Sequence, residues 1–218
     1  MFKVILQLLP WPLRRKILIK KFGYKIHPTA HIGLSYIYPK YLEMGEGASI
    51  GHFNVAIHLD RLVIGENSSI GRSNWITGFP TGTDSRFFSH DESRKSELIM
   101  GKESAITNKI SYMDIVCTKG DFVTIAGYSS QFLTHSIDIY ESRQDSHPIE
   151  IGDYCFVSTG VRVLGGAKLP AYSVLGAGAV LNKAYTKERM IYVGVPAVPK
   201  KEIPQGAKYF VREKGFVY

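Results

Sequence analysis

The second half of the chain carries aliphatic residues at an unbroken spacing of six positions. In order, they are Ile151, Val157, Val163, Leu169, Leu175 and Leu181. A small or compact residue lies four positions after each of the first five: Cys155, Val161, Ala167, Ser173 and Ala179. Neither a helical period of 3.6 nor a strand period of two produces this pattern. A repeat of six predicts a parallel β-helix, in which short strands joined by tight corners point aliphatic side chains into a narrow core.

The same period occurs earlier in the chain with a shifted phase. Its aliphatic positions are Ile26, Ile32, Met44, Ile50, Ile64, Ile70, Ile76, Met100, Ile106 and Ile125, and its small positions include Ser68, Asn74 and Ser104. Phase slips near 56–63, 112–124 and 138–150 predict loops or insertions at corners. The longest interruption, 79–98, is turn-rich at its start, and we expect it to leave the solenoid. Such excursions often line binding sites, with a solvated loop as the equal alternative.

Length and composition indicate one domain with short appendages. The chain has 218 residues, of which 44% are hydrophobic, enough for one continuous core. We therefore expect an all-β solenoid over 26–183 with excursions at 79–98 and 138–148. A short helical segment over 1–25 precedes it, and a tail over 184–218 follows it.

Cysteine content and apolar runs indicate a cytoplasmic protein. Cys117 and Cys155 form no disulfide framework or metal motif, and Cys155 falls at a small core position. No apolar run is long enough to span a membrane. The apolar start, 4–9, is short, is followed by prolines and lacks a small-residue cleavage site, so we expect no signal peptide.

The net charge of +8 is concentrated at the two ends of the chain. Residues 1–25 hold seven lysines and arginines and no acid, and residues 183–218 hold eight basic and three acidic residues. The repeat region between them is therefore acidic overall. A nucleic-acid-binding chain usually places a basic stripe on its main surface, so this distribution argues against nucleic acid as a partner.

The basic N-terminal segment has two interpretations. It mixes Trp11 and several aliphatic residues with lysine and arginine at roughly helical spacing. The favoured interpretation is a cap on the open first coil, which a solenoid requires for solubility. The second is an amphipathic segment that lies on an anionic membrane surface. The two are compatible.

One of the seven histidines stands in a distinctive context. They are His27, His31, His52, His58, His90, His135 and His147. Most lie among turns. His135 instead ends a repeat unit and precedes a polar insertion, where an imidazole can serve as a general base near neutral pH.

The Thr134-His135 element, the segment 148–153 and the Gly-Val-Pro ending at 194–196 extend this pattern. Together they resemble the hexapeptide-repeat acyltransferases, and most closely the sugar and surface-polysaccharide O-acetyltransferases of the galactoside/maltose type. The resemblance covers about 26–201 and is strongest over 123–201. It implies a left-handed parallel β-helix, a homotrimer with active sites between neighbouring subunits, acetyl-CoA as donor, a saccharide acceptor and no metal.

The resemblance also implies residue roles. His135 matches the catalytic histidine, which takes the proton of the acceptor hydroxyl. The backbone N–H of Thr159, next to Ser158, matches the oxyanion donor. Asn108 and its acidic neighbour Asp114 match substrate-contacting positions, although Asn108 could instead be a corner residue that tolerates a left-handed backbone.

Further matches concern the donor. Ala177 corresponds to a small residue beside the pantetheine chain, and Asn182 with Lys183 to a polar–basic pair near pantetheine and nucleotide. Lys200 and Lys201 would meet the CoA phosphates as point charges. A solvated tail is the alternative for these lysines.

Several features depart from the enzymes that acetylate free sugars. The excursion at 79–98, the basic segment over 1–25 and a break in the repeat at 131–137 favour a larger, lipid-linked acceptor in capsule, O-antigen or exopolysaccharide synthesis. We therefore expect a cytoplasmic protein that contacts the inner membrane face.

Three alternatives remain open. The first keeps the family but makes the acceptor an amino-sugar nucleotide, which would be N-acetylated, or serine. The second is a γ-type carbonic anhydrase, which needs three imidazoles around zinc; His135 and His147 are too far apart for a shared rung, and His27 with His31 lies at the first coil. The third is a solenoid scaffold without catalysis, against which His135 and the Gly-Val-Pro ending argue.

Overall fold

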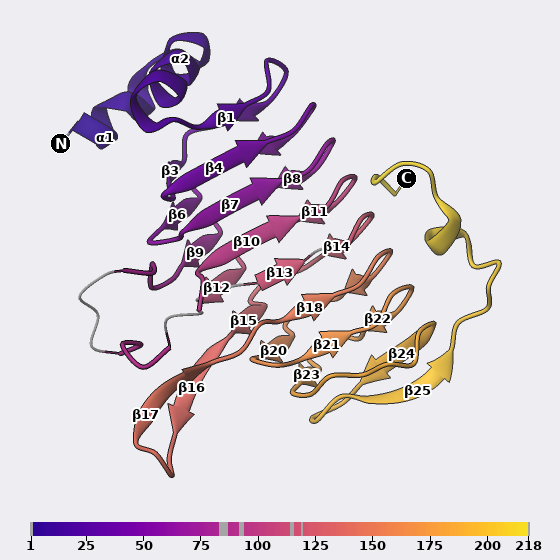
Figure 1. Ribbon diagram of the computed structural model, residues 1–218. Coiled ribbons are helices and arrows are strands. Elements are labelled where there is room, and N and C mark those ends of the chain that lie inside the picture. The colour runs from indigo at the N-terminus through magenta and orange to yellow at the C-terminus, as the bar shows by residue number, and fades with distance from the viewer. Residues whose placement is uncertain (1, 83–86, 92–93, 114–115, 119, 218) are drawn as a thin grey trace.

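A computed structural model describes residues 2–82, 87–91, 94–113, 116–118 and 120–217 (Figure 1). Across these residues the chain forms a parallel β-helix with three faces, and the coil winds in the left-handed sense, which confirms the predicted fold class. Sheet A contains β1 (Lys25–Ile26), β4 (Tyr41–Met44), β7 (Arg61–Ile64), β10 (Glu97–Met100), β13 (Val116–Thr118), β18 (Glu150–Ile151) and β21 (Lys168–Leu169).

The other two faces follow the same order. Sheet B contains β2 (His31–Ile32), β5 (Ser49–Ile50), β8 (Ser69–Ile70), β11 (Ala105–Ile106), β14 (Thr124–Ile125), β19 (Phe156–Val157), β22 (Val174–Leu175), β24 (Met190–Val193) and β25 (Val198–Glu202). Sheet C contains β3 (Tyr36–Tyr38), β6 (Val55–Ile57), β9 (Trp75–Thr77), β12 (Ser111–Met113), β15 (Gln131–Leu133), β20 (Arg162–Leu164) and β23 (Val180–Leu181). We call the corner columns that join these faces the A–B, B–C and C–A edges.

The six-residue repeat places like residues above one another. Three repeats make one turn of 18 residues, so Ile151 pairs with Leu169 on sheet A and Val157 with Leu175 on sheet B. The predicted aliphatic positions of this run are at most 2% exposed. Burial of each such side chain stabilises the fold by roughly 1.5–3 kcal/mol, and stacking therefore provides the stability that a single turn lacks.

Some inward corner positions hold polar side chains that bond along the axis. Asn74 is 1% exposed; its Nδ2 donates to the Thr107 carbonyl at 2.9 Å and to Asn54 Oδ1 at 2.9 Å. Asn74 Oδ1 accepts the Ile110 N–H at 3.0 Å. The amide therefore joins three consecutive turns and satisfies buried backbone groups at the corner.

Both insertions leave the solenoid from the C–A edge. The excursion lies between β9 and β10, and the second insertion is an antiparallel hairpin of β16 (His135–Asp138) and β17 (Arg143–Ser146). The expected break over 131–137 is wrong for its first part, because β15 stays in register with β20, with Phe132 opposite Val163. The repeat therefore continues to Thr134, and the hairpin starts at His135.

Glycine permits the close packing at the foot of the hairpin. The His147 N–H donates to the Thr134 carbonyl at 2.9 Å and closes the hairpin base. A Cβ on Gly165, in the next turn, would lie 2.5 Å from that carbonyl oxygen. Such contacts do not occur for real Cβ atoms, so this position requires glycine.

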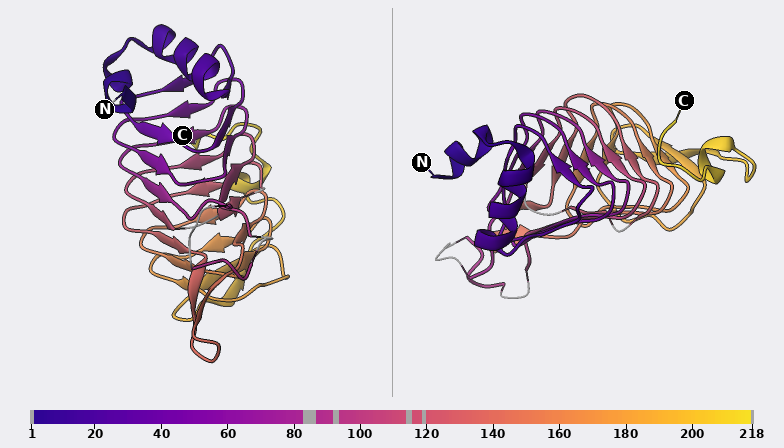
Figure 2. Two further views of the ribbon diagram at one scale, coloured as in Figure 1. Left: turned by 60° about the vertical axis from the view of Figure 1, so that its left-hand side comes forward. Right: turned by 90° about the horizontal axis from the view of Figure 1, so that it is seen from above.

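The N-terminal segment covers the open first turn (Figure 2). It consists of α1 (Phe2–Ile5), η1 (Leu6–Leu8) and α2 (Trp11–Phe22), which ends at Gly23 with φ +69°. Leu18 is 1% exposed against the first coil, and Trp11 Nε1 donates to the Ala30 carbonyl at 3.1 Å. No helix in the described part of the chain is both long and apolar enough to cross a bilayer.

The C-terminal residues finish sheet B and then run back along the A–B edge. β24 and β25 pair antiparallel, and η2 (Lys208–Val211) follows. The Arg212 guanidinium donates to the Phe122 carbonyl and lies 4.0 Å from the Tyr209 ring centroid. Gly215 N–H donates to Glu103 Oε2 at 2.6 Å. The tail therefore ties several turns together.

Candidate active site

His135 lies on the C–A edge, where the polypeptide leaves β15 and enters the hairpin. Its backbone is opposite Ser146 in the β16–β17 ladder. The imidazole is half-buried, and its Nδ1 is enclosed and has no hydrogen-bond partner among the described residues. Because Nδ1 is enclosed, Nε2 is the ring nitrogen that remains for contact with an external hydroxyl.

The excursion supplies an aromatic wall for this imidazole. The rings of Phe79 and Phe88 stand edge-on to it, with centroids 5.8 and 6.3 Å away and interplanar angles of 87°. The Arg94 guanidinium lies 4.0 Å from the Phe88 centroid and donates to the Phe79 carbonyl. The described part of the excursion thus packs against His135 and is not only a solvated loop.

Asp60 anchors the two ends of the excursion. Its carboxylate accepts the Thr81 hydroxyl at 2.9 Å and the Thr81 N–H at 3.1 Å. It also accepts the Ser96 N–H at 2.9 Å. Charge-assisted bonds of this kind are the stronger ones, so Asp60 fixes both ends of the excursion where it leaves and re-enters the coil.

The residues matched to oxyanion and acceptor binding lie on a different edge. Ser158 and Thr159 form the B–C corner between β19 and β20, and Asn108 occupies the same corner column nearer the N-terminus. The Thr159 N–H makes no hydrogen bond within the described chain, while its hydroxyl donates to the Tyr128 carbonyl at 3.0 Å. Thr159 is an exposed residue of this corner, and a backbone N–H without an internal partner can donate to a ligand.

Asn108 is exposed and helps to shape its corner. Its Oδ1 accepts the Arg72 N–H at 2.8 Å. The left-handed residue here is Lys109, with φ +55°, so the alternative of a left-handed backbone at Asn108 itself is wrong. Asp114, matched to the acidic neighbour, lies outside the described residues.

The residues matched to CoA fall on three parts of the solenoid. Asn182 and Lys183 follow β23 on the C–A edge, two turns beyond His135. Ala177 lies on the B–C edge, one turn beyond Thr159, and Lys200 with Lys201 lies on β25 of sheet B. All five side chains are exposed.

One chain therefore does not assemble all the predicted residues. His135 and Thr159 lie at opposite ends of sheet C, and the intervening strand of about five residues spans roughly 15 Å. A substrate touching both at hydrogen-bond distance would need the C–A edge of one chain and the B–C edge of another.

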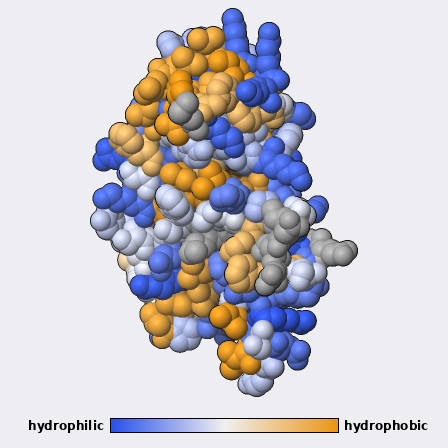
Figure 3. Space-filling model, turned by 90° about the vertical axis from the view of Figure 1, so that its left-hand side faces the viewer, coloured by the Kyte–Doolittle hydropathy of each residue, from blue (hydrophilic) through white to orange (hydrophobic). Residues whose placement is uncertain are grey.

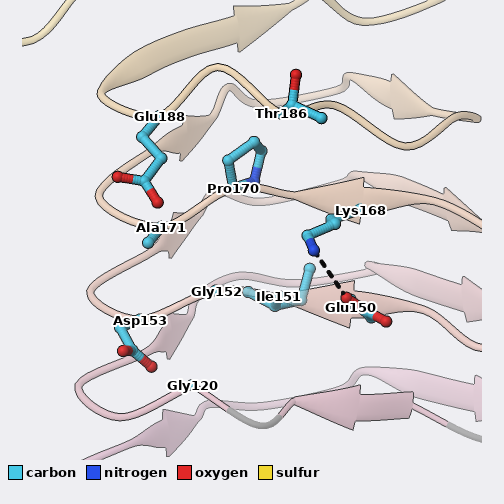
Figure 4. A pocket seen from close by; sticks show the side chains of 10 residues that line it. All are labelled: Gly120, Glu150, Ile151, Gly152, Asp153, Lys168, Pro170, Ala171, Thr186 and Glu188. Carbon is cyan, nitrogen blue, oxygen red and sulfur yellow. Dashed lines mark ion pairs between the residues drawn. The ribbon is translucent and has the colours of Figure 1, made fainter.

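Figure 4 shows a separate pocket of about 370 Å³ on sheet A and the A–B edge. Lys168 pairs with Glu150 at 3.1 Å, and Asp153 and Glu188 line the other side. Asp153 Oδ1 accepts the Asp121 N–H at 2.9 Å and so has a structural role. Three carboxylates against one ammonium disfavour the phosphates of CoA.

The first-coil histidines are engaged locally. His27 Nδ1 lies 2.8 Å from the Thr29 hydroxyl, and the His31 ring packs edge-on against Trp11. Within the described ranges, no group of three or more His, Cys, Asp or Glu side chains lies close enough to hold a metal ion.

Comparisons with known proteins identify the fold. No family profile and no curated protein matches the chain. Among solved structures, a polysialic acid O-acetyltransferase (OatWY) aligns with a TM-score of 0.54 at 16% identity, over 85% of this chain and 87% of that one. A hexapeptide-repeat-containing acetyltransferase from Vibrio cholerae aligns with a TM-score of 0.50 at 16% identity, over 93% and 87%. The chain has the fold of the hexapeptide-repeat acyltransferases.

A third solved structure has a similar fold. AntD, an N-acyltransferase from Bacillus cereus in complex with dTDP and 3-hydroxybutyryl-CoA, aligns with a TM-score of 0.52 at 14% identity, over 87% of this chain and 89% of that one. Structures that share the hexapeptide-repeat acyltransferase fold thus include O- and N-acyltransferases.

Two features of the site were missed from sequence, although signals for both exist. Phe79, Phe87 and Phe88 stand out as aromatic residues within an otherwise polar stretch, which favours contact with something. The phase of the repeat also shows that Thr159 follows a sheet B strand, whereas His135 follows a sheet C strand. The phase of the repeat therefore predicts that Thr159 and His135 lie on different edges.

Proposed function

We propose that the protein is an acetyl-CoA-dependent O-acetyltransferase that modifies a saccharide hydroxyl during surface-polysaccharide synthesis in the cytoplasm. The observation that carries the proposal is the pair of edges, within a hexapeptide-repeat fold: one holds a half-buried imidazole whose Nδ1 is enclosed, and the other holds a backbone N–H without a partner among the described residues. A base and an oxyanion donor are the two groups that acyl transfer requires.

The reaction follows from these groups. Nε2 of His135 accepts the proton as the acceptor oxygen attacks the thioester carbonyl, and the Thr159 N–H donates to the resulting oxyanion. Collapse of the tetrahedral intermediate breaks the C–S bond, and the imidazolium returns the proton to the CoA sulfur. The products are an O-acetyl ester and free CoA. A positioned base of this kind contributes roughly 10²–10⁴-fold.

The same proposal includes a homotrimer, because the site is incomplete in one chain. The C–A edge of one subunit would lie against the B–C edge of the next, so that His135 meets Thr159 of the partner copy. Closed cyclic symmetry then repeats this contact and gives three equivalent sites.

Mixed trimers test this arrangement. Chains with His135→Ala and chains with Thr159→Pro, each inactive alone, carry different affinity tags and are co-expressed. Trimers that hold both tags contain one site with both residues intact, so we expect about one third of wild-type turnover. Turnover at the level of the single variants would show that both residues serve the same chain's site or none.

We propose that acetyl-CoA binds along the C-terminal turns, between the C–A edge of one subunit and the B–C edge of the next. Ala177 leaves room for the pantetheine chain, and Lys183 and Lys201 are exposed cations for the phosphates. Replacing both lysines by glutamate should raise the acetyl-CoA KM at least tenfold, since like charges would then face the phosphates. Unchanged CoA affinity in calorimetry would move the donor elsewhere.

N-acylation of an amino-sugar nucleotide is the second candidate. The similarity to AntD, whose structure holds dTDP and an acyl-CoA, favours it. Hydroxylamine decides between the two, because it cleaves an ester product readily and leaves an amide intact. Saccharide and amino-sugar-nucleotide acceptors should both be tested, with release of the CoA thiol as the common readout.

A further inference from the structure

The N-terminal segment exposes a set of large apolar side chains that its capping role does not require. They are Phe2, Val4, Ile5, Leu8 and Leu13, with exposed fractions between 46% for Phe2 and 80% for Leu8. Figure 3 shows hydrophobic residues gathered at this end of the molecule, with hydrophilic side chains standing at their border. We call these five residues, together with Lys16, Lys20 and Lys21 of α2, the N-terminal surface.

Different residues attach the segment to the solenoid. Leu6 and Leu18 are at most 2% exposed, and Arg14 donates to the Gly33 carbonyl at 2.9 Å. The Tyr38 hydroxyl donates to the Lys3 carbonyl at 2.9 Å and accepts from Gln7 Nε2 at 2.9 Å. These contacts fix α1, η1 and α2 in place and leave the N-terminal surface directed outward.

Positive charge borders the apolar residues. Lys16, Lys20 and Lys21 are exposed on α2, and the Lys21 ammonium lies 3.7 Å from the Phe2 ring centroid. No acidic residue occurs in 1–25. Protein interfaces are depleted in lysine, whereas an apolar face flanked by lysines is typical of segments that lie in an anionic lipid interface.

We propose that the N-terminal surface docks on an anionic phospholipid bilayer. The apolar side chains enter the boundary between headgroups and acyl chains, and the lysines of α2 meet the phosphates. Docking does not depend on the proposed acetyl transfer; only its consequence for the acceptor rests on the proposed function.

Docking has a consequence for the acceptor because the N-terminal segment and His135 both lie at the C–A edge. α1 and η1 contact Tyr38 at the C–A edge, the edge from which the excursion and the hairpin also leave, and all three project to the same side of Figure 1. From β3 to β15 the chain climbs four strand spacings, about 20 Å. A saccharide carried on a membrane lipid would therefore reach His135 along the edge that the docking surface holds near the bilayer.

Vesicle sedimentation with the full chain tests the docking. Wild-type protein should sediment with phosphatidylglycerol–phosphatidylcholine vesicles at low salt, lose binding at high salt, and ignore pure phosphatidylcholine. Lys16, Lys20 and Lys21 changed together to glutamine should weaken partitioning on the order of 100-fold, about fivefold per lysine. The matched control changes Lys102, Lys208 and Lys214 to glutamine, removes the same charge elsewhere, and should bind like the wild type.

The apolar contribution is tested separately. Leu8→Ser with Ile5→Ser should reduce binding at least tenfold, while Val211→Ser with Val217→Ser, two exposed residues of the tail, should not. Thermal unfolding of each variant shows that the solenoid is intact. Equal loss in the control variants, or no binding of wild-type protein to anionic vesicles, would overturn the proposal. A drop in oligomer size for Leu8→Ser without vesicle binding would instead assign the surface to a second protein chain.

Discussion

Replacing Thr159 by proline removes one backbone N–H and the side-chain hydroxyl, and the conformation of the corner is compatible with proline. Gly160 has φ +66°, and Thr159 precedes it at a two-residue corner, which is the arrangement of a type II turn with the first central position at 159. Proline favours that position. The preceding residue must be extended, and Ser158 directly follows β19, with its N–H donating to the Leu175 carbonyl at 2.9 Å.

The expected effect on stability is small. The Thr159 N–H has no partner in the described chain, so its loss breaks no internal hydrogen bond. The hydroxyl bond to the Tyr128 carbonyl is lost, which costs about 1 kcal/mol. Proline in a compatible conformation stabilises the folded protein by about 0.4–1 kcal/mol, because it reduces the conformational entropy of the unfolded chain. The two contributions nearly cancel, and the midpoint of thermal unfolding should move by only a few degrees.

The expected effect on catalysis is large. Loss of one oxyanion donor lowers kcat by about 10²–10³-fold, or roughly 2.7–4 kcal/mol. Thr159→Ala is the matched control, since it removes the same hydroxyl and keeps the N–H. Initial rates of CoA thiol release should therefore fall on the order of 100-fold or more for proline and stay within about threefold of wild type for alanine. Equal losses in both variants, or full turnover with proline, would refute the oxyanion assignment.

Three further predictions concern packing. Gly165→Ala pushes a Cβ against the Thr134 carbonyl beneath the hairpin, so urea unfolding should show a loss of about 1–3 kcal/mol, with a fall in kcat; an unchanged variant would mean that the hairpin base yields freely. Burial raises the pKa of the Cys155 thiol to about 12, so the thiol stays protonated well below that pH. In native Cys117→Ser protein at pH 8, iodoacetamide should therefore leave Cys155 unmodified until denaturant is added. Rapid labelling of the native protein, measured by mass spectrometry, would contradict this. Arg212→Gln removes a cation that lies against three aromatic rings and should destabilise the protein by about 1–2 kcal/mol and speed hydrogen exchange in the tail; unchanged exchange would show that other contacts hold the tail.

The solenoid could be predicted from sequence because its pattern is short and regular. A period of six with three faces brings Ile151, Leu169 and their equivalents onto the same face in successive turns. Each residue's position within a turn then follows from counting. The interruption at 79–98 marks the first insertion for the same reason, since a polar, turn-rich stretch cannot supply the inward aliphatic residue that each face requires. The second insertion was expected over 138–148, whereas its hairpin begins at His135.

The contacts between the insertions and the coil could not be predicted by counting positions within the six-residue repeat. Phe79 and Phe88 meet His135 across more than 45 residues of sequence, and only the path of the excursion along the C–A edge brings them together. The repeat fixes where an insertion begins and ends. It does not fix the direction in which the inserted chain folds, because that depends on anchors such as Asp60, whose partners are distant in sequence.

The candidate catalytic residues could likewise be predicted from the sequence only in part. Residue type and local context marked His135 as a candidate base, and the repeat made Thr159 a corner residue. The three-dimensional coil alone shows that Nδ1 of the imidazole is enclosed and that the Thr159 N–H has no partner among the described residues. It also puts these groups at opposite ends of sheet C, because a rigid parallel strand of fixed rise separates its two edges whatever the side chains are.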